Sequence, residues 1–368
     1  MRIVFDARLH FPAVSGMSRY IVNLLNHLLA IDNANQYIIL INGQLPASDE
    51  LFLLQKYPNV TFKKIALHHM GIVNYTKMPA IIRDLKPDIY HYPHLDAPIV
   101  KGIKTIATIH DSNLSGNIKK FDDPFRIKTW YFKKTLANTL KKAASVIFIS
   151  NASKNEILND YADASNEKFK LVYNGFDSQF GQISEQTIID VKSKFHLEKP
   201  FLLYVGQIRS HKNIRRMVQS FLKTNSDWEF ILVGHNYMKI DFSKYPKNVR
   251  YLSVVPENDL KGLYYHSKAF VFPSFIEGFG FPVLESLSFG KPIIGTNYGA
   301  IAEIGDGFLI GVDPKDENDI AAKMAQFMNQ SETALDLVDC KNYIQKFSWK
   351  TCAEEVLAIY KETFFGIK

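Results

Sequence analysis

The chain has 368 residues and a net charge of +7, with 46% apolar and 22% charged residues. The length favours two domains of ordinary size, and the composition is that of a globular protein, which excludes disordered and fibrous classes. Its two cysteines, Cys340 and Cys352, have no Cys or His at metal-ligand spacing, so the sequence supports neither a disulfide framework nor a zinc site.

The N-terminus, MRIVFDAR, passes directly into a strand-like run. It lacks the long apolar region and cleavage site of a secretory signal, and no run of about 18 apolar residues occurs in the sequence. We therefore expect a cytoplasmic protein without a membrane-spanning helix.

Apolar, β-rich runs alternate with amphipathic segments through the first half of the chain. The predicted strands are residues 2–7, 37–42, 89–92, 104–111 and 145–150. Predicted helices between them include residues 18–31 and 135–144. Such alternation predicts βαβ units and a parallel sheet.

The pattern restarts after a polar segment, residues 178–200, that reads as a linker with a short helix. New strands are predicted at residues 201–206, 228–234, 249–255, 269–274 and 292–296. We therefore predict an N-terminal Rossmann-like domain over residues 1–178 and a C-terminal one over 179–350. A closing helix, residues 351–368, is expected to pack back on the first domain.

The excess positive charge is concentrated in residues 118–142, which hold eight Lys or Arg and two Asp. A basic, aromatic-bearing helical segment of this kind can lie on an anionic membrane surface or attract a phosphorylated partner. A solvated helix face is the alternative interpretation. No nucleic-acid partner is expected.

The turn after the strand at 269–274 carries the main chemical signal. Glu277 is placed in the loop and Glu285 on the first turn of the helix that Pro282 opens. The free amides of such a helix N-terminus bind phosphate, and Gly278 and Gly280 let the backbone approach a ligand closely. Carboxylates beside a phosphate site would accept hydrogen bonds from sugar or ribose hydroxyls. A purely structural role for Glu285 in the first turn is the alternative.

The run EGFGFPVLE, residues 277–285, resembles the signature of retaining glycosyltransferases of family 4. These enzymes have the α/β fold called GT-B, in which two Rossmann-like domains with parallel sheets face a central cleft. Similar family motifs occur in the expected order across nearly the whole chain: SGMSRYIVNLL (15–25), TIHD (108–111), FISNASKNEI (148–157), VYNGFD (172–177), YVGQIRSHKNI (204–214), TNYGAIAEIGDG (296–307) and FSWKTCAEEVLAIY (347–360).

The resemblance implies a nucleotide-diphosphate sugar donor held mainly by the C-terminal domain. Glu277 would bind the sugar hydroxyls, Glu285 the ribose, and Lys212 would neutralise the diphosphate. Many relatives carry a second cation as an Arg where this chain has Gln207, and Arg209 is the candidate replacement. The other residues implied to line the donor site are Gly16, Gly206, Gly278, Phe279, Gly280 and Glu303.

His110, Glu277 and Lys212 are the implied catalytic residues, and the acceptor is implied to bind the N-terminal domain. His110 ends an apolar strand, where a core histidine is the alternative. The candidate acceptor-binding residues are Arg19, His91, His94 and Asp111. A solvated charge is the alternative for Arg19 and a capping role for Asp111. The run HYPHLDAP, 91–98, superficially resembles a metal site, but Pro93 between the histidines favours an acceptor-side loop.

The resemblance also implies retention of the anomeric configuration by front-face attack, in which the leaving phosphate receives the proton. No metal or other cofactor is expected. We expect the donor to be GDP-mannose and the acceptor to be a glycan or lipid-linked glycan of a bacterial surface polysaccharide, made at the inner face of the cytoplasmic membrane. The alternatives are a UDP-sugar-dependent glycosyltransferase of the same fold and a non-enzymatic carbohydrate- or polyanion-binding protein.

Overall fold

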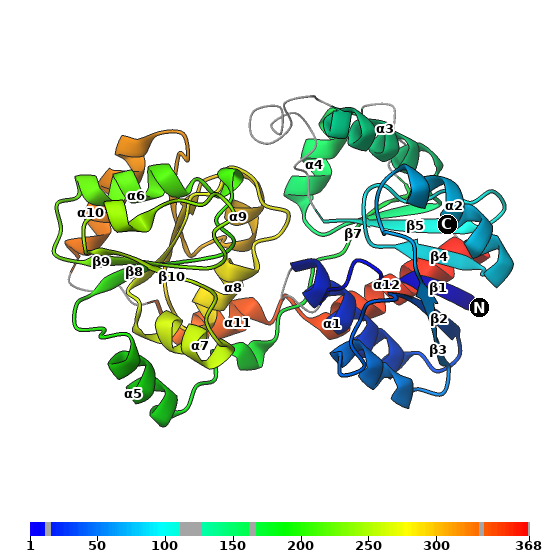
Figure 1. The fold of residues 1–368 in the computed structure, drawn as a ribbon, viewed down its shortest axis with the longest axis horizontal. Coiled ribbons are helices and arrows are strands. Elements are labelled where there is room, and N and C mark those ends of the chain that lie inside the picture. Colours follow the sequence, from blue (N-terminus) through cyan, green and yellow to red (C-terminus); the bar gives the residue numbers. More distant parts are fainter. Residues whose placement is uncertain (12–15, 111–126, 162–166, 331–334, 367–368) are drawn as a thin grey trace. The chain divides into compact units, whose positions relative to one another are not determined.

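The computed structural model describes residues 1–11, 16–110, 127–161, 167–330 and 335–366, and the backbone alone at 127–129. The chain divides into two compact units (Figure 1). The first comprises Met1–Gly175 and Phe347–Lys368, and the second Phe176–Lys346. We expected the chain to pass between the domains after residues 178 and 350; the division instead follows residues 175 and 346.

The first unit contains a seven-stranded sheet of order β3-β2-β1-β4-β5-β6-β7, with every pair parallel. Its strands are β1 (Arg2–Asp6), β2 (Gln36–Asn42), β3 (Val60–Ile65), β4 (Ile89–Tyr92), β5 (Lys104–Ile109), β6 (Ser145–Phe148) and β7 (Phe169–Leu171). Its helices are α1 (Gly16–Ile31), η1 (Glu50–Lys56), α2 (Ile72–Leu85), α3 (Ile127–Lys142), α4 (Asn151–Asn159) and α12 (Trp349–Phe365).

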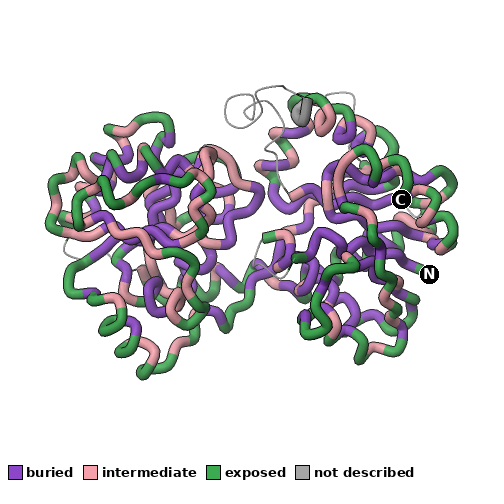
Figure 2. The backbone as a smooth tube through the Cα atoms, in the orientation of Figure 1, coloured by how far each residue is buried: buried purple, intermediate pink, exposed green. Residues whose placement is uncertain are grey.

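The central strands form because their residues are apolar on both faces. Ile3, Val4 and Phe5 of β1 are fully buried, as a parallel strand covered by helices on both sides requires. Figure 2 shows such buried runs along the strands of each unit, with exposed residues on the outer helices and loops. The core of the first unit therefore lies on both faces of its sheet.

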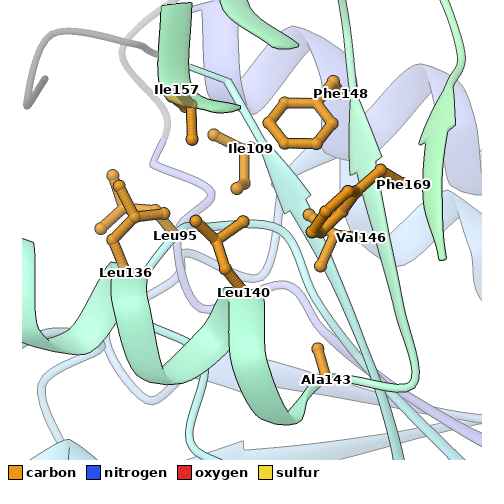
Figure 3. Close-up of a cluster of buried hydrophobic side chains, with 9 residues drawn as sticks. All are labelled: Leu95, Ile109, Leu136, Leu140, Ala143, Val146, Phe148, Ile157 and Phe169. Atoms are coloured by element: carbon orange, nitrogen blue, oxygen red, sulfur yellow. The ribbon is translucent and has the colours of Figure 1, made fainter. Parts of the chain in front are cut away.

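One part of this core lies between α3, α4 and strands β5 to β7 (Figure 3). Leu136 and Leu140 of α3 point toward Leu95, which lies in the segment after β4. Leu95 is only 3% exposed, so this segment is anchored to the core.

The closing helix α12 packs against α1 in the first unit. The Ser348 hydroxyl caps α12 by accepting a hydrogen bond from the Thr351 amide. Trp349 and Tyr360 bury their rings on the inner face of the helix. Gly175 allows this packing, because a β-carbon there would lie 2.2 Å from the Trp349 nitrogen.

The second unit contains a six-stranded sheet of order β10-β9-β8-β11-β12-β13, again parallel throughout. Its strands are β8 (Phe201–Val205), β9 (Glu229–Val233), β10 (Val249–Leu252), β11 (Ala269–Phe272), β12 (Ile293–Thr296) and β13 (Leu309–Val312). Its helices are η3 (Ser178–Gly181), α5 (Glu185–Lys194), η4 (Ser210–Lys212), α6 (Ile214–Lys223), η5 (Phe242–Lys244), α7 (Glu257–His266), α8 (Phe281–Ser288), α9 (Gly299–Ile304), α10 (Glu317–Met328) and α11 (Leu337–Ile344).

Each sheet has one topological switch point, where the strand order reverses. It lies between β1 and β4 in the first unit and between β8 and β11 in the second. In open α/β sheets, ligands bind beyond the carboxyl ends of the strands at such a point. A ligand site is therefore expected in the loops that follow β1 and β4 in the first unit and β8 and β11 in the second.

The predicted fold class, two Rossmann-like α/β domains with parallel sheets, is confirmed. Strands β3, β7 and β13 were not predicted. All three lie at sheet edges. In β3, Lys63 and Lys64 are exposed, so this edge strand lacks the apolar run by which a central strand is recognised.

Candidate functional site

An ion pair between Lys212 and Glu277 occupies the switch point of the second unit. Lys212 ends η4, in the loop after β8, and Glu277 lies in the loop after β11. The Lys212 ammonium lies 2.5 Å from one carboxylate oxygen of Glu277 and 2.7 Å from the other. The two side chains are 15% and 11% exposed, so both groups are largely shielded but still reachable.

Asn213 holds the lysine loop in place. It adopts a left-handed conformation, with φ of 62°, between η4 and α6. Its side-chain amide donates to the carbonyl of Pro273, which follows β11, and to that of Pro314, at 3.1 and 2.7 Å. The Phe275 amide also donates to the His211 carbonyl at 2.9 Å. The two loops are therefore joined through their backbones, which positions Lys212 opposite Glu277.

The glycine-rich loop leads into α8 as the sequence predicts. Gly280 is the N-cap of α8, with φ of +96°, and Pro282 lies in its first turn. Gly206 also has a positive φ, +151°, in the turn after β8. Gly278 and Phe279, which lie between Glu277 and Gly280 in the sequence, are both buried, and Phe279 is 3% exposed. The backbone conformations at Gly206 and Gly280 favour glycine, whether or not a ligand is bound.

Glu285 differs from its predicted position. It is the fifth residue of α8 and so lies in the second turn, not the first. It is 3% exposed, and its carboxylate accepts a hydrogen bond of 2.9 Å from the Tyr264 hydroxyl of α7. The early start of α8 at Phe281 accounts for the difference, and Tyr264 is a partner that the sequence analysis missed because no local signal links the two helices.

Arg209 and Gln207 contact each other in the loop after β8. The Arg209 Nε donates to the Gln207 side-chain oxygen at 2.8 Å. Its guanidinium carbon lies 3.9 Å from the centroid of the Tyr237 ring, which is 50% exposed. The candidate second cation is thus held by two neighbours instead of lying loose in solvent.

The remaining donor-side candidates lie in different places. Glu303 lies on α9, partly buried, and its carbonyl accepts from the Tyr343 hydroxyl at 3.4 Å. Gly16 begins α1 in the first unit and is exposed, and Arg19 lies one turn further on, partly buried. None of these placements assigns the residue a ligand.

His110 follows β5 in the first unit, with its ring edge-on to Tyr20 at 4.4 Å between centroids. Within the described residues, its buried Nε2 atom has no hydrogen-bond partner. Burial lowers the His110 pKa to about 3, so the ring is neutral at pH 7. A neutral imidazole with an unsatisfied nitrogen can accept or donate one hydrogen bond to a ligand.

His91, a predicted acceptor-binding residue, is a core residue in this structure. It is fully buried in β4. Its Nδ1 pairs with the Tyr360 hydroxyl of α12 at 2.6 Å, and its Nε2 with the Thr108 hydroxyl of β5 at 2.8 Å. Both ring nitrogens are therefore used inside the protein. Period-two alternation along β4 could have warned that His91 and His94 do not share a face.

His94 lies just beyond β4, with its Nδ1 hydrogen-bonded to Asp96. Its side chain is 14% exposed, whereas that of Asp96 is fully buried. In the described part of the chain, no group of three or more His, Cys, Asp or Glu side chains could hold a metal ion. Asp111 and residues 118–126 of the basic segment lie outside the described residues.

The described end of the basic segment forms the exposed face of α3. Trp130 is 63% exposed, and the Lys134 ammonium lies 4.9 Å from its ring centroid. Lys141 and Lys142 are exposed in the last turn. Across the described ranges, the helices are all too short or too polar to cross a membrane.

Each of the two units matches a model of a known protein family. A family model described as Glycosyltransferase Family 4 matches residues 14–180, and one described as Glycosyl transferases group 1 matches residues 185–345. The O-antigen chain mannosyltransferase B of Escherichia coli is 25% identical over 392 aligned residues, which cover 98% of this chain and all of that protein.

Solved structures share the fold over nearly the full length. Sucrose-phosphate synthase from Thermosynechococcus elongatus has a TM-score of 0.77 at 16% identity, covering 99% of both chains. WaaG, a glycosyltransferase involved in lipopolysaccharide biosynthesis, has a TM-score of 0.72 at 14% identity, covering 97% of this chain and 99% of its own.

The protein is a hexosyltransferase of the GT-B type. It has two Rossmann-like units with parallel sheets, each unit matches a glycosyltransferase family model, and a Lys–Glu pair lies at the switch point of the second sheet. The chain belongs to glycosyltransferase family 4, as its motifs predicted. The non-enzymatic alternative is thereby set aside.

Proposed function

We propose that this enzyme transfers mannose from GDP-mannose, with retention of configuration, to a glycan or lipid-linked glycan acceptor in the synthesis of a bacterial surface polysaccharide. The observation that carries the proposal is the Lys212–Glu277 pair at the switch point of the second unit. The similarity to an O-antigen chain mannosyltransferase over the whole chain supports the choice of sugar and product.

The Lys–Glu pair suits a donor with both anionic and hydroxyl groups. Departure of the nucleoside diphosphate places growing negative charge on the β-phosphate, and a positioned ammonium stabilises that charge. Glu277 accepts hydrogen bonds from the transferred sugar. When the donor enters, its phosphate and hydroxyls replace part of the contact that each side chain makes with the other.

Two further features support diphosphate binding without a metal. Arg209 is held between Gln207 and Tyr237, three residues before Lys212, and supplies the second positive charge in our proposal. The N-terminus of α8, opened by Gly280, places the positive end of the helix dipole in the loop that carries Glu277. Together these groups offer the charge that a divalent cation supplies in other transferases.

Retention follows in our proposal from attack on the same face as the leaving group. The acceptor hydroxyl enters beside the departing phosphate, a bond forms from its oxygen to the anomeric carbon, and the phosphate oxygen takes its proton. Glu277 then binds the sugar hydroxyls and is not a nucleophile. His110, neutral and with an unsatisfied nitrogen among the described residues, contacts the sugar or orients the acceptor.

The exposed face of α3 is proposed to touch the anionic surface of the cytoplasmic membrane. Trp130 and Lys134 present an aromatic ring and an ammonium side by side. Tryptophan favours the membrane interface, and each lysine near an anionic surface contributes about 1 kcal/mol. Such contact would bring the enzyme to a lipid-linked acceptor.

Product analysis tests the proposal. The purified enzyme is incubated with GDP-mannose, and separately with UDP-glucose and UDP-galactose, in EDTA with methyl α-D-mannoside, α-mannobiose and lipid-linked acceptors. We expect transfer from GDP-mannose alone, with an α-linkage by NMR. Transfer only from a UDP-sugar would favour the alternative donor, a β-linkage would contradict retention, and activity that requires a metal would contradict the charge assignment.

A further inference from the structure

The switch point of the first unit carries a second cluster of polar and aromatic side chains that the proposed donor chemistry does not use. It consists of Phe11, which follows β1, His69, which follows β3, and His94 with Asp96, which follow β4. Strands β1 and β4 are the pair at which the sheet order reverses. The cluster therefore lies where an open parallel sheet binds its ligand.

A buried ion pair between Arg8 and Asp6 lies near His69, at the end of β1. Arg8 is fully buried and pairs with Asp6 through two hydrogen bonds of 2.8 and 2.7 Å. Arg8 also donates to the Leu67 carbonyl and to the Asn74 side chain, at 3.1 and 2.9 Å. These bonds join the ends of β1, β3 and α2. Because Arg8 is paired with Asp6, this ion pair carries no net charge with which to attract an anionic ligand.

His69 carries an unsatisfied nitrogen. The residue is 8% exposed, and its Nδ1 has no hydrogen-bond partner among the described residues. Its ring stacks on His68 at 4.3 Å and meets the edge of Phe11 at 5.2 Å, while its carbonyl accepts from the Tyr92 hydroxyl at 2.5 Å. Burial lowers the His69 pKa to about 4, so this ring is neutral. A buried polar atom left unpaired points to a ligand.

Asp96 selects the tautomer of His94. A carboxylate only accepts, so the His94 Nδ1 that faces it carries a proton, and in the neutral ring the other nitrogen, Nε2, is an acceptor. The second Asp96 oxygen accepts from the Tyr131 hydroxyl of α3 at 3.2 Å. Leu95, between the two residues, is anchored in the core shown in Figure 3. The dyad is therefore held from both α3 and the sheet.

We propose that Asp96 is a positioning residue that keeps His94 in this tautomer, so that His94 Nε2 accepts a hydrogen bond from a hydroxyl of a neutral acceptor sugar. His69 and the 40%-exposed ring of Phe11 complete the subsite. Neutral hydrogen-bonding groups beside an aromatic ring match a saccharide, with its hydroxyls and apolar C–H surface, and do not match a phosphate. The inference rests on the proposed glycosyl transfer and names the acceptor side of it.

Histidine NMR on the full chain tests this directly. Selectively labelled His94 and His69 are assigned with His94→Gln and His69→Gln, and the ¹⁵N shifts report which ring nitrogen holds a proton. We expect Nδ1–H for His94. We also expect both histidines to respond to methyl α-D-mannoside, α-mannobiose or methyl N-acetyl-β-D-glucosaminide, and not to GDP. The opposite His94 tautomer, or no response to any of these saccharides, would overturn the inference.

Asp96→Asn provides the kinetic test. An asparagine amide can donate to His94 Nδ1, which favours the opposite tautomer and removes the hydroxyl acceptor. We expect the acceptor KM to rise about tenfold, the effect of one hydrogen bond, with the donor KM unchanged. His27→Gln on α1 is the control, because in the described part of the chain His27 bonds locally, to the Asn23 carbonyl of its own helix. An unchanged acceptor KM would contradict the inference.

These outcomes separate the two proposals. If nucleotide sugars fail to bind while saccharides still shift His94 and His69, the proposed donor chemistry is wrong and the acceptor subsite stands. If nucleotide sugars bind and transfer while Asp96→Asn matches the wild type, the donor chemistry stands and the subsite is wrong.

Discussion

Lys212 and Glu277, which are 65 positions apart in the chain, form an ion pair at the reversal point of the second sheet, with ammonium-to-carboxylate distances of 2.5 and 2.7 Å. Two neighbouring parallel strands, β8 and β11, bring them together. The pair unites the predicted phosphate-binding cation and the predicted sugar-binding carboxylate in one place. We therefore propose that the donor binds around this pair in the second unit.

Removing the lysine should harm both catalysis and stability. We expect Lys212→Ala to lower kcat by about 10²- to 10³-fold, because the variant loses the positive charge that stabilises the leaving diphosphate. It also leaves the largely buried Glu277 carboxylate unpaired, which lowers the melting temperature. Steady-state assays of nucleotide release and thermal unfolding measure the two effects.

The matched control for that variant is the double substitution Lys212→Met with Glu277→Gln. A neutral pair of similar shape should restore the melting temperature without restoring kcat. Recovery of kcat in the double variant would show that the charges act only on folding.

Glu285 should distinguish ribose from deoxyribose. Its carboxylate is buried against the Tyr264 hydroxyl, so Glu285→Gln is preferable to Glu285→Ala, which would leave a cavity. We expect Glu285→Gln to weaken GDP binding about tenfold and 2′-deoxy-GDP binding less. Tyr264→Phe removes the tyrosine hydroxyl alone and should keep the preference. Equal loss for both nucleotides would assign Glu285 a purely structural role.

We expect Arg209 to contribute to binding of the diphosphate and not to binding of the guanine base. We expect Arg209→Ala to weaken GDP about tenfold, the effect of one charge-assisted contact, and to leave guanosine binding unchanged. Calorimetric titration of both ligands measures this. Arg215→Ala, on the exposed side of α6, is the control. If the two variants bind GDP equally well, the charge missing at Gln207 is not replaced by Arg209.

The buried histidines should make the first unit sensitive to acid. Burial lowers the His91 pKa to about 3, against about 6.5 in an unfolded chain. Between these values the unfolded state binds more protons than the folded state. The contribution of neutral His91 to the free energy of unfolding is therefore complete above about pH 6.5 and decreases as the pH falls below that value. Each such histidine lowers the free energy of unfolding by on the order of 1.4 kcal/mol when the pH falls from 7.5 to 5.5.

Urea unfolding of His91→Gln at those two pH values checks this. The variant should be less stable at pH 7.5, since it disturbs the bonds to Tyr360 and Thr108, but should lose less free energy on acidification. His27→Gln should keep the wild-type pH dependence. A His91→Gln protein with that same dependence would refute the assignment.

Much of the fold was predictable because central parallel strands are apolar on both faces. The runs at β1, β5 and β8 are therefore visible in the sequence. The edge strand β3 is not, since its burial alternates and it carries two exposed lysines. The helix boundaries were also predicted inexactly. Because α8 begins at Phe281, Glu285 lies in the second turn of the helix and not in the first.

The site was predictable where it follows local motifs and not where it depends on tertiary packing. Glu277 and Lys212 could be named from their loops, but their contact comes from the pairing of β8 with β11. His91 was assigned with His94 to an acceptor-side loop, yet strand β4 places it in the core. Tyr264 and Asp96 act through packing of distant elements, for which the sequence holds no local signal.

The exposed face of α3 should determine membrane binding. We expect Lys→Glu substitution at positions 133, 134, 141 and 142 to reduce sedimentation with vesicles of 30% phosphatidylserine by at least tenfold, since charge attraction becomes repulsion. The same reversal of four exposed lysines of the second unit, at 192, 199, 244 and 247, is the charge-matched control. Equal sedimentation of both variants would contradict membrane contact through α3.

The most direct test of the central claim is calorimetric titration of GDP-mannose, in EDTA, into the wild type and Lys212→Ala. The account predicts saturable one-to-one binding to the wild type, displaced by GDP and not by guanosine, and at least tenfold weaker binding to the variant. Equal affinity in the two proteins, or binding only when a divalent metal is added, would contradict the claim that Lys212 and Glu277 form the donor site.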